Sequence, residues 1–362
     1  MLENWLRSLS GELITLRDQL PEESFGKRIR LFGEDTEEIT EGSLVLLGIQ
    51  EPAGEEVRKE LFALAPPPEG VDIIDLGNVR RDDPGFMIPL LQELFESKVC
   101  TLLLSSRPKY LQAQFQAQRN LQRPVSVSVI DERIASRNSG YLEELLQKPH
   151  PDLFHLSLLG FQSHLSAPSE IRTLEERHFE VLRLGALRSD ITQAEPYLRD
   201  ADLIGFQLSA MRQSEAPGVS RATPSGLYSE DACQIARYAG MSDKLRAFGI
   251  FGYRPDLDRR RQTAQLCAHL VWYFSEGFAN RKQDFPLSTD GLVEYIVDFK
   301  TMDLHLTFWK SARSGRWWLQ VPEAPPQDMK RHWLIPCSYT DYTQACNGEL
   351  PGRLVNALKR FK

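Results

Sequence analysis

Short apolar runs alternate with helix-like stretches along most of the chain. Eight of these runs lack strict polar alternation, which is typical of parallel strands buried on both faces of a sheet. The stretches between them are long enough to carry the chain back across that sheet. We therefore predict an α/β fold with an eight-stranded, mostly parallel sheet. The expected strands are residues 43–49, 71–76, 99–104, 125–130, 153–160, 179–184, 202–208 and 245–251.

The two ends of the chain have different patterns. Leucines spaced three and four residues apart predict an amphipathic helix over residues 3–20, within a helical lead-in that covers residues 1–42. After residue 285 the apolar positions alternate or cluster with aromatic residues, as in an antiparallel meander that ends in a short helix. We therefore predict a main domain over residues 1–285, and a C-terminal β/α extension over residues 286–362 that packs on or beside it.

Composition narrows the class of protein. The 362 residues include 43 Lys plus Arg and 50 Asp plus Glu, a formal net charge of −7. An acidic chain of ordinary hydrophobic content is expected to be globular, with no nucleic-acid partner. No apolar run has the length of a membrane span, and the N-terminus lacks the pattern of a signal peptide. Five scattered cysteines without a CxxC pair favour a reduced, cytoplasmic protein.

The most informative segment is residues 205–240, where a buried strand leads through a loop into a helix. The loop contains Ala216-Pro217-Gly218 and then Pro224-x-Gly226-Leu227. In these motifs and their spacing the chain resembles the ureohydrolase family of arginase, agmatinase and formimidoylglutamase, over roughly residues 43–285. The resemblance is closest to the formimidoylglutamase-like branch of Bacteroidetes, which WKSARSGRWW and PCSYTDY also resemble. It implies a three-layer α/β/α arginase-like fold, self-association and, in active members, hydrolysis of C–N bonds in linear amidines at two manganese ions.

The resemblance also implies where the metal ligands of the family fall in this sequence. Only Asp131 keeps a ligand type, and the acidic residue that holds the substrate guanidinium falls near Gly252. Manganese ions need carboxylate and imidazole ligands, and one carboxylate cannot hold two dications. We therefore predict a vestigial site that binds no metal and contains no catalytic residue. The six ligand positions are Pro108, Asp131, Arg133, Ala135, Gln207 and Ser209.

Several residues near the strand ends could neutralise the vestigial site, rebuild it or supply another chemistry. Arg133 could neutralise the site by pairing with Asp131 or Glu132. His164 and Arg212 are possible pocket residues, and Arg212 or Arg133 could bind a carboxylate. The remaining candidates are expected to have structural roles: Asp256 and Asp258 as turn and cap residues, Glu215 as a solvated loop residue, His155 as a hydrogen-bonded core residue, and Cys233 and Cys267 as core residues.

The C-terminal extension is rich in tryptophan. Basic residues beside these tryptophans predict a protein interaction surface, because Trp and Arg are enriched at binding hot spots. The alternative is that the tryptophans cap the main sheet or a subunit contact. The predicted surface comprises Trp309, Lys310, Arg316, Trp317 and Trp318.

Three functions remain open from the sequence. The first is a catalytically inactive ureohydrolase-fold protein, a pseudoenzyme that serves as a structural or interaction component without a cofactor. The second is a manganese-dependent amidinohydrolase such as formimidoylglutamase. The third is a binder of a carboxylate-bearing small molecule in the vestigial pocket.

Overall fold

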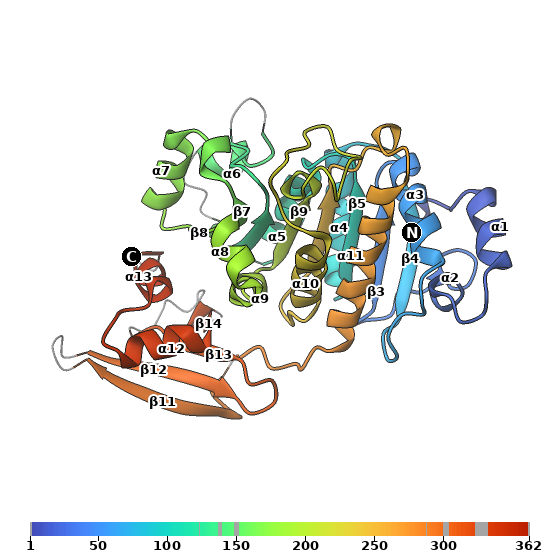
Figure 1. Cartoon of the computed structure of the whole chain (residues 1–362). Coiled ribbons are helices and arrows are strands. Elements are labelled where there is room, and N and C mark those ends of the chain that lie inside the picture. The colour runs from blue at the N-terminus through green and yellow to red at the C-terminus, as the bar shows by residue number, and fades with distance from the viewer. Residues whose placement is uncertain are drawn as a thin grey trace.

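The computed structural model describes residues 2–122, 124–136, 140–147, 152–286, 288–299, 304–322 and 332–360. All eight predicted strands are present and pair in parallel within one large sheet, in the order β4-β3-β5-β10-β9-β6-β7-β8 (Figure 1). Their bounds are β3 Leu44–Gly48, β4 Ile73–Val79, β5 Cys100–Ser105, β6 Val125–Ile130, β7 Leu153–Phe161, β8 Glu180–Arg183, β9 Leu203–Gln207 and β10 Ala247–Phe251.

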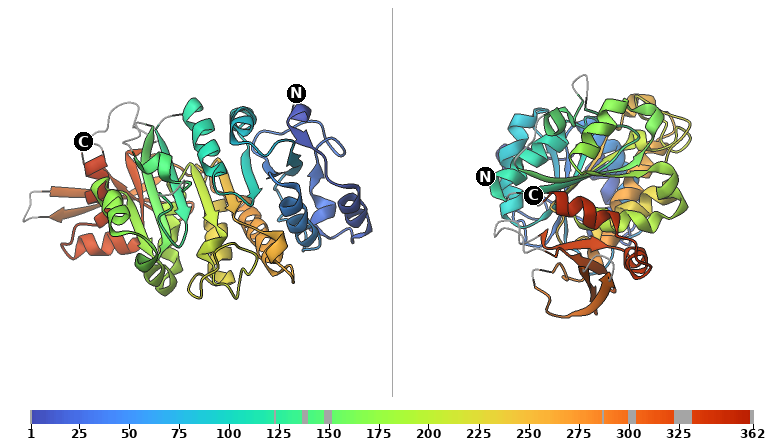
Figure 2. Two further views of the ribbon diagram at one scale, coloured as in Figure 1. Left: turned by 90° about the horizontal axis from the view of Figure 1, so that it is seen from above. Right: turned by 90° about the vertical axis from the view of Figure 1, so that its left-hand side faces the viewer.

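Helices cover both faces of this sheet and form two separate cores with it (Figure 2). One face packs against α4 (Pro84–Glu96), α5 (Tyr110–Leu121), α6 (Glu143–Gln147) and α7 (Pro168–Glu176). The other packs against α1 (Gly11–Gln19), α2 (Phe25–Arg28), α3 (Glu51–Phe62), α8 (Leu184–Ser189), α9 (Ala194–Arg199), α10 (Ser229–Gly240) and α11 (Gln262–Ala279). The predicted three-layer α/β/α class is confirmed.

The N-terminal segment differs from the predicted helix. The helix α1 begins only at Gly11, where the Ser10 hydroxyl accepts a hydrogen bond from the Leu13 amide at 3.3 Å. Before it, β1 (Leu6–Arg7) pairs antiparallel with β4, and Leu6 packs on the opposite face of the sheet from Leu13. The strand β2 (Arg30–Leu31) also joins β4, so the sheet has ten strands rather than eight.

The C-terminal segment forms a separate antiparallel sheet, in the order β11-β12-β13-β14. The predicted division at residue 285 falls between α11 and this sheet. Two helices follow along the chain. The bounds are β11 Leu292–Phe299, β12 Leu304–Ser311, β13 Trp317–Gln320, β14 Leu334–Cys337, α12 Tyr339–Cys346 and α13 Gly352–Arg360.

The extension lies at the amino ends of the parallel strands. Arg199, just before β9, donates to the carbonyl oxygens of Trp317 and Cys337 at 3.2 Å. Its guanidinium carbon also lies 4.4 Å from the centre of the Trp318 ring. The carboxyl ends of the strands, where ligands bind in open α/β sheets, therefore lie at the edge opposite the extension (Figure 1). None of the helices in the described ranges is long and apolar enough to cross a membrane.

Candidate functional site

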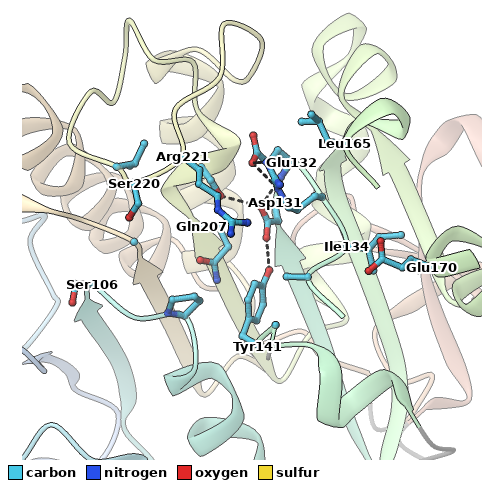
Figure 3. Close-up of a pocket in the computed structure, with 17 residues that line it drawn as sticks. Ser106, Asp131, Glu132, Ile134, Tyr141, Leu165, Glu170, Gln207, Ser220 and Arg221 are labelled. Carbon is cyan, nitrogen blue, oxygen red and sulfur yellow. Dashed lines mark hydrogen bonds and ion pairs between the residues drawn. The ribbon is translucent and has the colours of Figure 1, made fainter. Parts of the chain in front are cut away.

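A pocket of about 480 Å³ lies beyond the carboxyl ends of β5, β6, β9 and β10 (Figure 3). The six predicted ligand positions and Gly252 all line it, although they come from four separate strand ends. Parallel strands bring such ends together at one edge of a sheet. The residues singled out by the resemblance therefore share one site, while their ancestral roles stay a prediction.

Asp131 is the buried carboxylate of this pocket, and its side chain accepts hydrogen bonds on both oxygens (Figure 3). The Tyr141 hydroxyl donates to Oδ2 at 2.6 Å, and the Ser209 hydroxyl donates to Oδ1 at 3.0 Å. The Glu132 amide donates to Oδ1 at 2.7 Å. Burial raises the pKa of Asp131 to about 6, because these hydrogen bonds only partly offset the loss of water around the carboxylate.

Arg133 pairs with Glu132, so of its two hypothesised partners the structure selects this one. The guanidinium contacts Oε1 of Glu132 through Nε, at 2.8 Å, and through Nη2. The Glu132 side chain is fully buried, and its Oε2 has no hydrogen-bond partner among the described residues. Oε2 of Glu132 is therefore a buried acceptor behind the pocket surface, out of reach of solvent.

These residues do not fit a pair of manganese ions. The side chains of Pro108 and Ala135 have no metal-binding atom, and Arg133 brings a positive charge to the site. Both oxygens of Asp131 already accept hydrogen bonds from hydroxyl groups of the chain. Within the described residues, no group of three or more His, Cys, Asp or Glu side chains could hold a metal ion.

Two predicted pocket residues lie outside the pocket. His164 is exposed in a short 3-10 helix after β7. Arg212 packs 4.0 Å over the Tyr228 ring, and its Nε donates to the Gly226 carbonyl at 3.4 Å. Arg221, from the same loop, lines the pocket instead, with Ser220 beside it. Sequence reasoning missed Arg221, because apolar periodicity does not tell which way a loop residue faces.

The loop that carries the family motifs forms one wall of the pocket, and packing explains its glycines. A Cβ on Gly226 would lie 2.5 Å from the backbone carbonyl carbon of Met211. A Cβ on Gly218 would lie 2.7 Å from Cβ of Asp258. A Cβ at such distances would force its neighbours to shift, so both glycines favour the closed form of the loop, whatever the pocket does.

The remaining charged candidates have structural contacts. Glu215 is half-buried and accepts from the Ser229 amide at the start of α10, at 3.2 Å, so the prediction of a solvated residue is wrong. Asp258 accepts from the Ala264 amide in the first turn of α11, at 3.0 Å, in agreement with a capping role. His155 is buried within 2.9 Å of Glu180, as predicted for a hydrogen-bonded core residue.

Two further groups of predicted residues are largely buried. Trp317 and Trp318 are buried, and Nε of Arg316 lies 3.2 Å from Glu195 of α9. These three cannot form an exposed interaction surface, because they pack within the extension or against the main domain. Trp309 and Lys310 are half-buried. The thiols of Cys233 and Cys267 are buried, which raises the pKa of both and makes them poor nucleophiles, as expected of core residues.

Comparison with known proteins assigns the fold to a class. The sequence model described as "Arginase family" matches residues 136–275. The structure resembles that of a Trypanosoma cruzi formiminoglutamase with Mn2+, with a TM-score of 0.63 and 13% identity over 71% of this chain and 99% of that one. It also resembles the formimidoylglutamase of Bacillus subtilis, with a TM-score of 0.63 and 16% identity over 72% and 92% of the two chains. At such identities the likeness shows the fold, which is that of arginase.

Curated sequences match part of the chain. The chain is 32% identical over 131 residues to a formimidoylglutamase of Vibrio vulnificus, a match that covers 33% of this chain and 38% of that protein. It is 23% identical over 140 residues to the formimidoylglutamase of Bacillus subtilis, over 37% and 43%. The matches thus span less than half the length of these relatives. Together with the family match over residues 136–275, they show that this part of the chain is similar to the arginase family.

Proposed function

We propose that this chain is an arginase-fold protein without hydrolase activity that serves as an interaction component. The observation that carries the proposal is the bonding of Asp131. The carboxylate that the family would offer to manganese is held by the hydroxyl groups of Tyr141 and Ser209 instead. The pocket keeps its shape through contacts of its own side chains, and these contacts require no ion.

A manganese-dependent amidinohydrolase is the second candidate, because curated relatives of the chain are named formimidoylglutamase. This function requires that Asp131 exchange its hydroxyl partners for metal ions. It also requires further ligands, and the positions at which the resemblance expects them include Pro108 and Ala135.

Binding of a small carboxylate-bearing molecule is the third candidate. Arg221 and Ser220 line the pocket and could contact a carboxylate. A ligand that binds only the folded chain would raise its melting temperature, so a thermal-shift screen of such compounds tests this function separately.

Hydrolysis of a linear amidine in the presence of Mn2+ tests the proposal. The chain is incubated with N-formimidoylglutamate, and release of the amide product is measured, with the Trypanosoma cruzi formiminoglutamase as a positive control. We expect the wild type and Asp131→Ala to give the same background rate. A rate above background that Asp131→Ala loses would establish the hydrolase and overturn the proposal.

A further inference from the structure

The small C-terminal sheet has one protected edge and one open edge. Its edge strand β14 has four residues, all buried, contains Pro336, and lies against α9 and α13. The opposite edge strand β11 has eight residues and no proline, and lies on the outside of the extension, away from the large sheet (Figures 1 and 2). In the described part of the chain, β11 pairs only with β12. One side of β11 therefore presents backbone groups that a further strand could bond.

This open edge also exposes apolar side chains. Ile296 has 61% of its surface exposed, the highest value among the large apolar residues that the structure describes, and Val293 has 48%. Protected edges typically carry charged side chains, above all lysine, or a proline or a bulge. The β11 sequence LVEYIVDF has no lysine or proline, its pairing with β12 is regular over all eight positions, and its only charged residues are Glu294 and Asp298. Such an edge is a template for strand addition.

Charge decides which kind of strand fits. Residues 294, 296 and 298 lie on the same face of β11, because side chains alternate along a strand. Glu294 is exposed, and the Asp298 side chain is 57% exposed beside His305. That face thus presents an acidic, an apolar and an acidic side chain in turn. A second copy paired antiparallel about Ile296 would put Glu294 of one copy opposite Asp298 of the other, and like charges in that position are destabilising.

We propose that β11 binds an extended basic segment of a partner protein as a fifth strand of this sheet. Two cationic side chains of the segment, four residues apart, lie opposite Glu294 and Asp298, and an apolar side chain between them lies opposite Ile296. Backbone hydrogen bonds supply affinity, and the alternating side chains supply specificity. This inference deepens the interaction role proposed above by naming the class of partner. It does not depend on the loss of hydrolase activity.

Fluorescence anisotropy with short labelled peptides tests the inference on the full chain. The probe has the core Lys-Val-Ile-Val-Lys, and a matched peptide has Glu in place of both lysines. We expect saturable binding of the basic peptide alone. The double variant Glu294→Lys/Asp298→Lys is expected to lose roughly tenfold in affinity for it and to bind the acidic peptide instead. Glu349→Lys, an exposed charge reversal elsewhere on the extension, serves as the control and leaves binding unchanged.

Methylated peptides test whether the backbone is bonded. N-methylation of alternate residues along one edge of the peptide is expected to abolish binding, while methylation along its other edge leaves binding intact. Equal binding by the wild type and the double variant, or equal effects of methylation at both edges, would overturn the inference. So would absence of saturable binding at low salt. A concentration-dependent dimer that Ile296→Lys dissociates would assign the edge to a second copy. None of these outcomes depends on hydrolase activity. The peptide experiments can therefore refute strand addition at β11 without affecting the proposed loss of hydrolysis, and the reverse also holds.

Discussion

At the scale of single residues, the pocket depends on how each buried charge is compensated. Asp131 accepts three hydrogen bonds from donors of the chain itself, and Glu132 is balanced by the guanidinium of Arg133. Burying a charge is unfavourable unless it is paired or hydrogen-bonded. These local partners therefore explain how acidic side chains can remain in a pocket that, in our account, holds no metal.

Removal of one donor tests this interpretation. Tyr141→Phe keeps the ring but deletes the hydroxyl that donates to Asp131 at 2.6 Å. We expect it to lower the free energy of unfolding by roughly 1.5–3 kcal/mol, as for a hydrogen bond to a charged group. Urea denaturation at neutral pH measures the change. The control Tyr339→Phe removes an exposed hydroxyl and is expected to stay within about 0.5 kcal/mol of the wild type. Equal stability of both variants would contradict the role of Tyr141.

Sequence analysis could place the pocket but not its contacts. Strand ends follow from apolar runs, so the positions of Asp131 and Gln207 at one edge of the sheet were predictable. The partners of these residues were not. Tyr141 reaches Asp131 from a segment without a regular pattern, and Arg221 rather than Arg212 lines the pocket, because loop conformation depends on tertiary packing.

At the scale of elements, the loop between β9 and α10 shows why a family motif would persist even where, as we propose, the chemistry is absent. Its glycines allow close approach of two backbone segments, which any protein with this loop requires. The N-terminal segment shows that a sequence pattern can also predict the wrong element. Leucine spacing predicted one helix over residues 3–20, but pairing of Leu6 and Arg7 with β4 converts its first part into a strand. The spacing of apolar residues within a short segment does not reveal that a strand more than seventy residues away will pair with it.

A glycine substitution tests the packing of this loop. Gly226→Ala would place a Cβ within 2.6 Å of backbone atoms of Ala210, Met211 and Arg212, so the loop must shift. We expect a loss of roughly 1–3 kcal/mol in the free energy of unfolding, as for other overpacked sites. Gly185→Ala in α8 is the matched control, because a Cβ there meets no atom within 4 Å. Its expected effect is neutral or stabilising by up to about 1 kcal/mol. Similar losses in both variants would contradict the packing argument.

At the scale of the whole molecule, a buried charge cluster joins the extension to the edge of the main sheet. Arg353 of α13 lies 3.9 Å from Glu180 of β8, which in turn lies 2.9 Å from His155 of β7. Burial alone would raise the pKa of Glu180, but Arg353, His155 and Arg360 together lower it to about 2. Burial lowers the pKa of His155. The sequence predicted the extension but not where it contacts the main domain, because these contacts join residues far apart in the chain.

This cluster makes stability depend on pH. The pKa of Glu180 falls from an ordinary 4.5 to about 2 on folding, so its contribution is complete above pH 4.5 and is lost as the pH falls toward 2. The shift corresponds to about 3 kcal/mol. The pKa of His155 is also lowered on folding, so protonation of the unfolded chain reduces stability as the pH falls below the ordinary histidine value of 6.5.

Urea denaturation at several pH values is expected to show that Glu180→Gln loses less stability between pH 4.5 and 2 than the wild type. The exposed control Glu175→Gln is expected to follow the wild type, and coincident curves for all three would contradict the account.

In our proposal, this arginase-fold chain does not hold the manganese pair of a hydrolase. Metal content after purification, incubation with excess Mn2+ and extensive desalting tests it most directly, with the Trypanosoma cruzi formiminoglutamase treated in parallel. Elemental analysis is expected to find close to zero manganese per chain, because the oxygens of Asp131 are already bonded and, among the described residues, no group of three or more His, Cys, Asp or Glu side chains could hold a metal ion. A value near two manganese ions per chain would contradict the account and establish a working metal site in the pocket.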